Sequence, residues 1–386
     1  MRKIAVICST DYNTYPVGGM MSFIKDAAPT LGKYFNVDYW GVDVGGSTPE
    51  FISGGQRFAI RFFGKAKTER KIVPNLVRVV WNLYCNRRQI LAEGYDGLYI
   101  HGIPLNLGFP GRIGPKRINH VHGLTNPFLM QGLGNLQARV IAPLYTSYRR
   151  SVVRKSDLVL LAADHLGIKM FYDDHLVGTP IEKIENFCDT SLFSSAIPVD
   201  RTSEGLKPGG KVIVHVGRFA YQKDPLLAIR AFAAFRATVR KSEDVLVMIG
   251  DGPLLEEARV LARDLGVALQ IRFLGNQPRS AIASWLAGAD LYLYTSHANG
   301  YPISLAEAAQ SGLPIVSTSV TGVHDLVVPG RNGVLVQERT PVAFVAPIIK
   351  ALENRAAYGQ ASRELAAKYT PETVLTHLCQ EIADVL

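Results

Sequence analysis

The sequence has few cysteines and no long apolar run. Its four cysteines, Cys8, Cys85, Cys188 and Cys379, are scattered, with no Cys-x-x-Cys pair and no histidine-rich partner. This spacing argues against a disulfide framework and against a zinc site, and favours reduced thiols in a cytoplasmic compartment. The absence of a stretch of about 18 apolar residues argues against a membrane-spanning helix. The apolar run Ile4–Cys8 is too short for a signal peptide, so we expect none.

Charge is also scarce, and it is unevenly placed. Charged residues make up 19% of the chain and apolar residues 47%, which allows large cores, and a length of 386 residues predicts two or three domains. Residues 1–200 contain 23 Lys and Arg against 16 Asp and Glu, whereas residues 201–386 contain 19 against 17. The segment 56–88 holds nine basic residues and a single acid, Glu69.

The basic segment 56–88 allows three interpretations: a solvated surface helix and loop, a contact with an anionic membrane surface, or a nucleic-acid patch. Aromatic residues, among them Phe62, Phe63 and Trp81, are interleaved with its cations, which suits shallow insertion into an anionic membrane. No nucleic-acid-binding motif accompanies the segment, so we expect no such partner. We expect a cytoplasmic protein held peripherally at the inner face of a membrane, with the solvated surface as the alternative.

Short apolar runs alternate with amphipathic stretches along the chain. Such alternation is typical of parallel sheets with helices on both faces, and it predicts an α/β fold with two doubly wound, Rossmann-like domains. Strands are expected at residues 3–9, 37–43, 97–101, 117–122, 157–162, 211–216, 245–249, 271–274, 291–295 and 314–317.

A break in this alternation marks the domain limits. The segment 194–210 is rich in Ser, Pro and Gly and has little periodicity. We expect a first domain over 1–193, a second over 194–370, and a C-terminal helix over 371–386 that crosses back to the first domain. Ligands of such sheets bind at the carboxyl ends of the strands, so we expect the site in a cleft between two facing domains.

Two loops of the second half carry candidate binding residues. Arg218 and Lys223 follow the strand 211–216, where an Arg can bind phosphate oxygens bidentately and a Lys adds a point charge, although such a pair also occurs without a ligand. After the strand 291–295, a helix of small apolar residues begins near Ile303, and its free N–H groups can bind an anion. Its one charge, Glu307, could hold a ribose or simply complement the helix dipole.

Together these motifs resemble those of the family 4 glycosyltransferases, strongly over residues 211–336 and more weakly in the first half. The resemblance is carried by Gly217-Arg218 with Lys223, Gly250-Asp251-Gly252-Pro253, Asn299-Gly300-Tyr301-Pro302, Leu305-Ala306-Glu307-Ala308, Pro16-Val17-Gly18-Gly19 and Asn119-His120-Val121-His122-Gly123. It implies the GT-B architecture and a retaining transfer of a hexosyl group from a nucleoside diphosphate sugar, most often a UDP-sugar. It further implies an acceptor hydroxyl on a lipid-linked saccharide or glycolipid, as in lipopolysaccharide and other cell-surface polysaccharides.

The resemblance also assigns roles to residues. It implies catalytic roles for His122, Arg218 and Lys223. The donor-binding residues it implies are Gly18, Gly19, Asn299, Gly300, Tyr301, Pro302, Ile303, Ser304 and Glu307. No Asp-x-Asp motif stands at a strand end, so we expect no catalytic metal and no cofactor.

One position departs from the family pattern. The family usually has two glutamates eight positions apart, whereas here Asn299 occupies the first position and only Glu307 is an acid. Asn keeps a hydrogen-bonding side chain but has no charge, which leaves the donor sugar open. The alternatives are a non-catalytic protein that binds sugar nucleotides, and a two-domain sugar-nucleotide epimerase with paired catalytic carboxylates.

Overall fold

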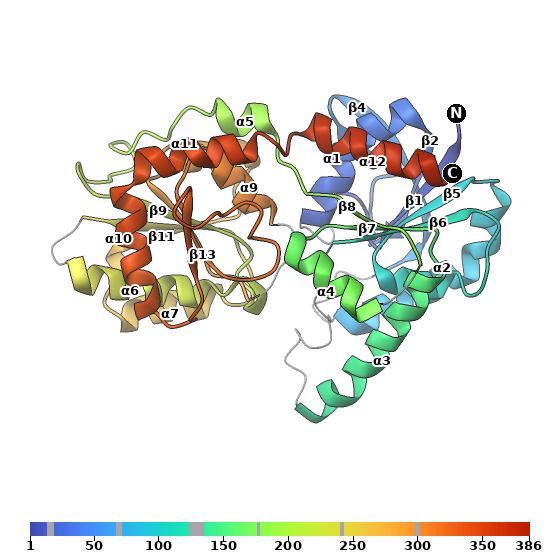
Figure 1. Cartoon of the computed structure of the whole chain (residues 1–386), viewed down its shortest axis with the longest axis horizontal. Coiled ribbons are helices and arrows are strands. Elements are labelled where there is room, and N and C mark those ends of the chain that lie inside the picture. Colours follow the sequence, from blue (N-terminus) through green and yellow to red (C-terminus); the bar gives the residue numbers. More distant parts are fainter. Residues whose placement is uncertain (14–18, 67–71, 123–134, 176–177, 240–242, 298–301) are drawn as a thin grey trace. The chain divides into compact units, whose positions relative to one another are not determined.

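The computed structural model describes residues 1–13, 19–66, 72–122, 135–175, 178–239, 243–297 and 302–386. The chain divides into two compact units, each with its own sheet (Figure 1). Unit 1 comprises Met1–Ala163, Gly167–Glu185 and Pro371–Leu386, and unit 2 comprises Asp164–Leu166 and Asn186–Thr370. Unit 2 therefore begins ahead of residue 194, because the short helix α5 (Thr190–Ser194) packs against helices of unit 2.

Unit 1 is built on an eight-stranded sheet with the order β3-β4-β2-β1-β5-β6-β7-β8. Every pair is parallel except the β3–β4 hairpin, which lies at the edge of the sheet. The strands are β1 (Lys3–Ile7), β2 (Asn36–Asp43), β3 (Glu50–Ser53), β4 (Gln56–Lys65), β5 (Gly97–His101), β6 (Lys116–Val121), β7 (Leu158–Leu161) and β8 (Ile181–Lys183). The helices are α1 (Gly19–Tyr34), α2 (Ile72–Ala92), η1 (Ile103–Gly108), α3 (Asn135–Arg154), α4 (His165–His175) and α12 (Pro371–Val385).

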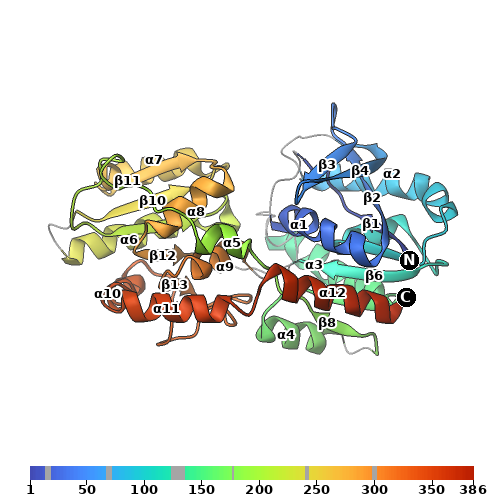
Figure 2. The same ribbon diagram turned by 90° about the horizontal axis from the view of Figure 1, so that it is seen from above.

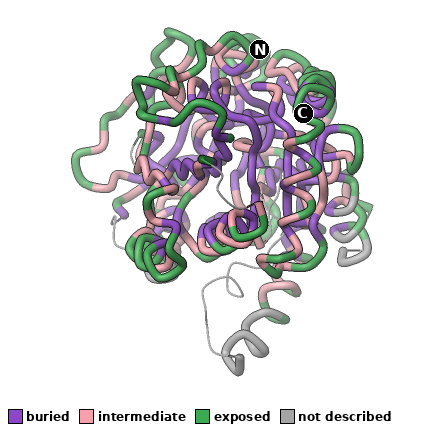
Figure 3. Tube along the Cα trace, turned by 90° about the vertical axis from the view of Figure 1, so that its left-hand side faces the viewer, coloured by how far each residue is buried: buried purple, intermediate pink, exposed green. Residues whose placement is uncertain are grey.

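The faces of the unit 1 sheet are covered by different helices. Side chains of β1 alternate, and Ala5 and Ile7 pack with Val79 and Leu83 of α2 in one core. Helices α1 and α12 lie side by side, as Figure 2 shows, so the C-terminal helix belongs to unit 1. The strands are mostly buried, as the purple segments of Figure 3 show, and they carry the core of each unit.

The basic segment 56–88 contains a strand that the sequence did not reveal. Its first part is β4, which lies between β3 and β2, and its later part belongs to α2, so the expected surface helix and loop is wrong for residues 56–65. Phe63 is only 2% exposed because alternation along β4 turns it into the core, and insertion of Phe63 into a membrane is therefore excluded. Trp81, by contrast, is 65% exposed. Residues 67–71 lie outside the described part of the chain.

Unit 2 is built on a fully parallel six-stranded sheet with the order β11-β10-β9-β12-β13-β14. Counted within the unit, this is the 3-2-1-4-5-6 order of dinucleotide-binding Rossmann folds, and the order reverses between β9 and β12. The strands are β9 (Val212–Val216), β10 (Val245–Ile249), β11 (Ile271–Gly275), β12 (Leu291–Tyr294), β13 (Ile315–Thr318) and β14 (Gly333–Val336). The helices are α5, η3 (Tyr221–Lys223), α6 (Pro225–Val239), α7 (Leu255–Asp264), η4 (Ala268–Gln270), α8 (Arg279–Ala287), α9 (Ile303–Gln310), η5 (Val342–Phe344), α10 (Val345–Glu353) and α11 (Arg355–Ala366).

The expected α/β fold with two sheets is confirmed. Each expected strand is present, with its ends shifted by at most two residues, whereas β3, β4, β8 and β14 were not expected. Among the helices of the described residues, none combines the length and the apolar character that crossing a membrane requires.

Candidate functional site

In unit 2, the candidate residues follow the two strands between which the strand order reverses. Arg218 and Lys223 lie on the segment after β9, and helix α9 begins after β12, the neighbour of β9. Because ligands of such sheets bind at this point of the carboxyl edge, the topology brings both predicted segments to the position where a ligand is expected. The hydroxyl of Tyr292 donates to the carbonyl oxygen of Val216 at 3.2 Å and also bonds to Ser304, which links the end of β9 to the first turn of α9.

The loop after β9 rests directly on the backbone of the loop after β10. The N–H of Phe219 donates to the carbonyl oxygen of Asp251 at 2.9 Å. Gly250 has φ 135°, and a Cβ atom there would lie 2.1 Å from the carbonyl oxygen of Gly217. Only glycine allows this approach, so Gly250 fixes the position of the loop that carries Arg218.

Lys223 is a partly buried cation. Its Nζ lies 3.5 Å from the hydroxyl oxygen of Tyr294 and 5.5 Å from the centroid of the Tyr294 ring. Burial lowers the pKa of Lys223 to about 8, because removal of water disfavours the charged form. Near neutral pH the amine is still mostly protonated, and a nearby anion would raise its pKa again. Arg218, in contrast, is exposed.

A charged network that the sequence did not reveal holds the two loops together. Asp224, which has a left-handed φ of 44°, accepts from the guanidinium of Arg339 and lies 3.2 Å from Nε2 of His297. Arg339 also donates to the carbonyl oxygens of Ser296, at 2.7 Å, and Thr295, at 3.0 Å. The ring of His297 stacks on Tyr221 of η3 with 4.3 Å between centroids. Arg339 lies more than 100 positions from Asp224, and no local motif connects the two.

Glu307 is buried in α9, at 7% exposure. Its Oε1 lies 3.7 Å from the guanidinium of Arg279, a residue at the start of α8. The negative charge of Glu307 contributes to raising the pKa of the nearby Cys188 thiol to about 12, although burial is the larger cause. A merely dipole-complementing glutamate would be solvated, so this burial beside a cation is compatible with a binding role.

Some of the predicted donor-binding residues lie outside the described part of the chain: Gly18, Asn299, Gly300 and Tyr301. Gly19 begins α1. Pro302 precedes α9 with φ −79° and ψ 112°, and Ile303 and Ser304 form the first turn of that helix. The amides of this turn are therefore at the end of β12, as the anion-site hypothesis requires.

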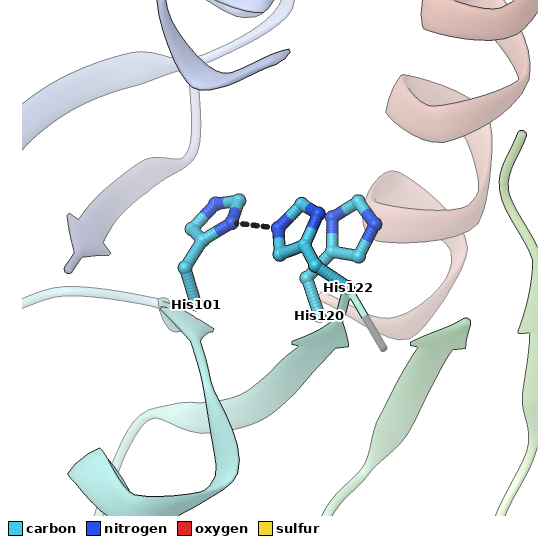
Figure 4. Close-up of side chains that lie close together, drawn as sticks. All are labelled: His101, His120 and His122. Atoms are coloured by element: carbon cyan, nitrogen blue, oxygen red, sulfur yellow. Dashed lines mark hydrogen bonds between the residues drawn. The ribbon is translucent and has the colours of Figure 1, made fainter. Parts of the chain in front are cut away.

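In unit 1, three histidines gather at the carboxyl ends of β5 and β6 (Figure 4). His101 ends β5, His120 lies in β6 and His122 follows it. The rings of His120 and His122 stack with 4.0 Å between centroids, as expected for residues two apart on one face of a strand. Nδ1 of His101 and Nε2 of His122 share a hydrogen bond of 2.8 Å, while Nδ1 of His120 bonds the hydroxyl of Tyr99 at 2.6 Å.

The three imidazoles are neutral at physiological pH. Burial lowers the pKa of His101 and of His120 well below the ordinary value, and it lowers the pKa of His122 to about 3. Among the described residues, three buried ring nitrogens have no hydrogen-bond partner: Nε2 of His101, Nε2 of His120 and Nδ1 of His122. A neutral imidazole with a spare nitrogen can accept from, or donate to, a sugar hydroxyl. The ring nitrogens also lie within 4.8 Å of one another, a spacing that could hold a metal ion, so metal independence stays a prediction.

Comparison with known proteins supports the family resemblance seen in the motifs. Residues 197–371, most of unit 2, match the family described as "Glycosyl transferases group 1". Unit 2 is therefore similar to the group 1 glycosyltransferases. A D-inositol 3-phosphate glycosyltransferase 2 of Catenulispora acidiphila is 32% identical over 180 residues, which is 44% of this chain and 42% of that protein. The chain spans about half the length of the curated relatives it matches, with 35% to 58% of each covered.

Solved structures match the chain over its full length. A sucrose-phosphate synthase from Thermosynechococcus elongatus has a TM-score of 0.83 at 17% identity and covers 100% of this chain and 99% of its own. Anabaena HepE, in complex with UDP and glucose, has a TM-score of 0.73 at 17% identity and covers 100% of both chains. At such identities the likeness establishes the fold alone. The GT-B fold expected from the motifs is confirmed.

Proposed function

We propose that this protein is a retaining hexosyltransferase that moves a hexosyl group from a UDP-sugar to an acceptor hydroxyl. The observation that carries the proposal is the pair of segments at the strand-order reversal of unit 2, where Arg218 and Lys223 follow β9 and the first turn of α9 follows β12. The complex of HepE with UDP and glucose, a protein of the same fold, supports the choice of nucleotide.

In this reaction the site must stabilise the departing diphosphate. As the bond from the anomeric carbon to the phosphate oxygen breaks, negative charge grows on the diphosphate. Arg218, Lys223 and the amides near Ser304 would stabilise that charge, because preorganised donors act most strongly where charge develops. Glu307 would accept hydrogen bonds from the ribose hydroxyls. This arrangement supplies cations from the chain itself, and we propose that no metal ion is needed.

Retention of configuration can arise by double displacement or by front-face attack, and the residues assigned to the sugar bear on this choice. A double displacement needs a carboxylate beside the anomeric carbon. The buried carboxylate in the loop after β1, Asp11, already accepts hydrogen bonds from the N–H of Asn13 at 3.1 Å and from Oγ of Ser47, between β2 and β3, at 3.4 Å. We therefore propose a front-face attack in which the leaving phosphate oxygen takes the acceptor proton, while neutral His122 binds sugar hydroxyls.

The acceptor is proposed to be a lipid-linked saccharide or glycolipid used in cell-surface polysaccharide synthesis. The support lies in unit 1, which carries most of the net positive charge, in the segment 56–88, and an exposed Trp81. Sugar nucleotides are soluble, so donor binding gives no reason for such a surface. Peripheral attachment to the inner face of a membrane would bring the enzyme to this acceptor.

A panel of nucleotide sugars tests the proposal. The protein is mixed with each compound, thermal stabilisation is measured, and release of nucleoside diphosphate is followed with and without excess EDTA. We expect one UDP-sugar to stabilise the protein and to be hydrolysed slowly, with EDTA having no effect, and NMR of a transfer product to show the donor's anomeric configuration. Stabilisation without turnover would favour a non-catalytic binding protein, and interconversion of the sugar would favour an epimerase. An inverted product would contradict the mechanism.

A further inference from the structure

Unit 1 contains an apolar groove remote in sequence from the strand-end loops. The groove lies between α2, η1 and α3 and has a volume of about 580 Å³, within the range of about 300–1,000 Å³ typical of small-molecule sites. Aliphatic and aromatic side chains line it, among them Val77, Val80, Trp81, Leu107, Leu144 and Tyr148.

The apolar side chains that line the groove are unusually exposed to solvent. Val77 and Trp81 are each 65% exposed, Leu144 is 66% exposed and Leu107 is 50% exposed. A contiguous exposed apolar surface of this kind marks an interaction site. The two walls formed by α3 and η1 are nevertheless joined to each other, because the hydroxyl of Tyr148 on α3 donates to the carbonyl oxygen of Ile103 on η1 at 3.0 Å. The groove is therefore preformed.

The two helices that form the groove walls carry positive charge and no negative charge. Neither α2 nor α3 contains an Asp or Glu, and the segment 97–156, which includes α3, contains none at all. On α2 the guanidinium carbon of Arg87 lies 3.7 Å from the ring centroid of Tyr84, a residue of the groove. Exposed cations also lie on both helices or directly after α3: Arg78, Arg88, Arg150, Arg154 and Lys155.

The cations of β4 are paired with carboxylates, which distinguishes them from those of the groove helices. Arg57 pairs with Glu50 at 2.9 Å, and Arg61 pairs with Glu93 at 2.8 Å and lies 3.5 Å from Asp38. These carboxylates partly neutralise the strand, whereas the groove helices have no acid of their own. The part of the basic segment best suited to an anionic partner is therefore α2, together with the α3 wall that the segment 56–88 does not include.

We propose that this groove binds one hydrocarbon chain of an anionic, phosphate-bearing membrane lipid. The apolar lining suits the chain, the cations of α2 and α3 suit the headgroup phosphate, and Trp81 and Tyr84 suit the interface between the two. Lipid binding is measurable without a sugar nucleotide. Lipid binding itself does not depend on the proposed function. Only the further step, that this lipid carries the acceptor sugar, rests on it.

Trp81 supplies a built-in probe of the proposal. Trp40 and Trp285, the other two tryptophans, are 3% and 6% exposed, so quenching by lipid reports mainly on Trp81. The full-length protein is titrated with vesicles whose acyl chains are brominated, made either of phosphatidylglycerol or of phosphatidylcholine. We expect strong quenching by the anionic vesicles, at least tenfold weaker binding to the neutral ones, and no quenching in Trp81→Phe.

Matched variants locate the bound chain. Val77→Glu and Leu144→Glu are expected to weaken binding to anionic vesicles at least tenfold. Val342→Glu and Leu269→Glu change residues of unit 2 that are more exposed, at 74% and 94%, and are expected to leave binding unchanged. Binding is followed by sedimentation as well as by quenching, and circular dichroism checks that each variant is folded.

Several results would overturn the lipid site. Absence of quenching by anionic vesicles, equal quenching by neutral vesicles, or equal losses in the unit 1 and unit 2 variants would each do so. A concentration-dependent shift of Trp81 emission without lipid would assign the groove to a second copy of the chain instead. Release of nucleoside diphosphate from a soluble donor is assayed in the same variants, so failure of the lipid site and failure of the transferase proposal give different patterns.

Discussion

At the carboxyl edge of the unit 2 sheet the candidate side chains are charged, whereas at the same edge of unit 1 they are neutral. Unit 2 places Arg218, Lys223 and the Arg339 network there. Unit 1 places three buried imidazoles there, each with its pKa lowered by burial. Under the proposed function, the two parallel sheets would serve different halves of one reaction: cations where charge develops, and uncharged donors and acceptors where hydroxyls bind.

Removing the cations of unit 2 should produce the largest effect. Arg218→Ala and Lys223→Ala should each lower kcat/KM by about 10- to 100-fold, since each removes a charge-assisted contact of about 1.5–3 kcal/mol, and the double variant should lose more. The measurement is steady-state kinetics with the donor identified by the panel. Lys211→Ala is the matched control, because Lys211 immediately precedes β9, at the opposite end of that strand, and is exposed. Near-normal kcat/KM in both site variants would contradict the assignment.

The two edges also differ in how far the sequence predicts them. Arg218, Lys223 and Glu307 are found from sequence because strand-to-helix loops and helix starts carry local signals. The stacking of His120 on His122 follows from alternation along one strand. Contacts between distant segments have no such signal: His101 joins His122 across two strands, and Arg339 joins Asp224 across more than 100 positions.

The same distinction explains the missed strands. β3 and β4 form an antiparallel hairpin at the edge of the sheet, and the alternation of β4 is interrupted by basic residues and by a shift of its register against β2. The apolar groove could not be read from the sequence either, because its walls come from α2, η1 and α3 and their packing decides which apolar residues stay exposed.

Replacing Arg339 should produce the second largest effect on catalysis. Arg339→Lys keeps the charge but loses the planar fork that bonds Asp224, Thr295 and Ser296 at once. We expect the donor KM to rise about tenfold with a smaller change in kcat, because the β9 and β12 loops lose their link but keep their ligand residues. Arg331→Lys is the control, since Arg331 is exposed and its nearest carboxylate, on Glu364, is 3.5 Å away. A fall in thermal stability with unchanged KM would mean that the network only stabilises the fold.

The buried neutral histidines of unit 1 should make the free energy of unfolding fall as the pH is lowered. The folded-state pKa of His122 is about 3, below the unfolded value of about 6.5, so its contribution is present above pH 6.5 and is lost as pH falls towards 3. At pH 5 the loss from His122 is about 2 kcal/mol. Urea unfolding at pH 7 and pH 5 measures it, and His122→Gln should show the smaller pH dependence. Equal pH dependence in wild type and variant would show that His122 is solvated and not part of a neutral cluster.

Glu307 is expected to give the smallest effect and to test the charged edge most finely. Replacement by Gln keeps the shape and the hydrogen-bonding oxygen but removes the charge beside Arg279. If Glu307 holds the ribose, the free nucleoside diphosphate and the intact donor should both bind about 3- to 10-fold more weakly, a loss of about 1 kcal/mol. Calorimetry with UDP measures this without any turnover. Glu256→Gln is the control, because Glu256 also lies near the start of a helix, α7, but its side chain is 85% exposed. Unchanged affinity in Glu307→Gln would leave its carboxylate as a partner of Arg279 alone, and the charged edge of unit 2 would then be confined to the phosphate-binding segments.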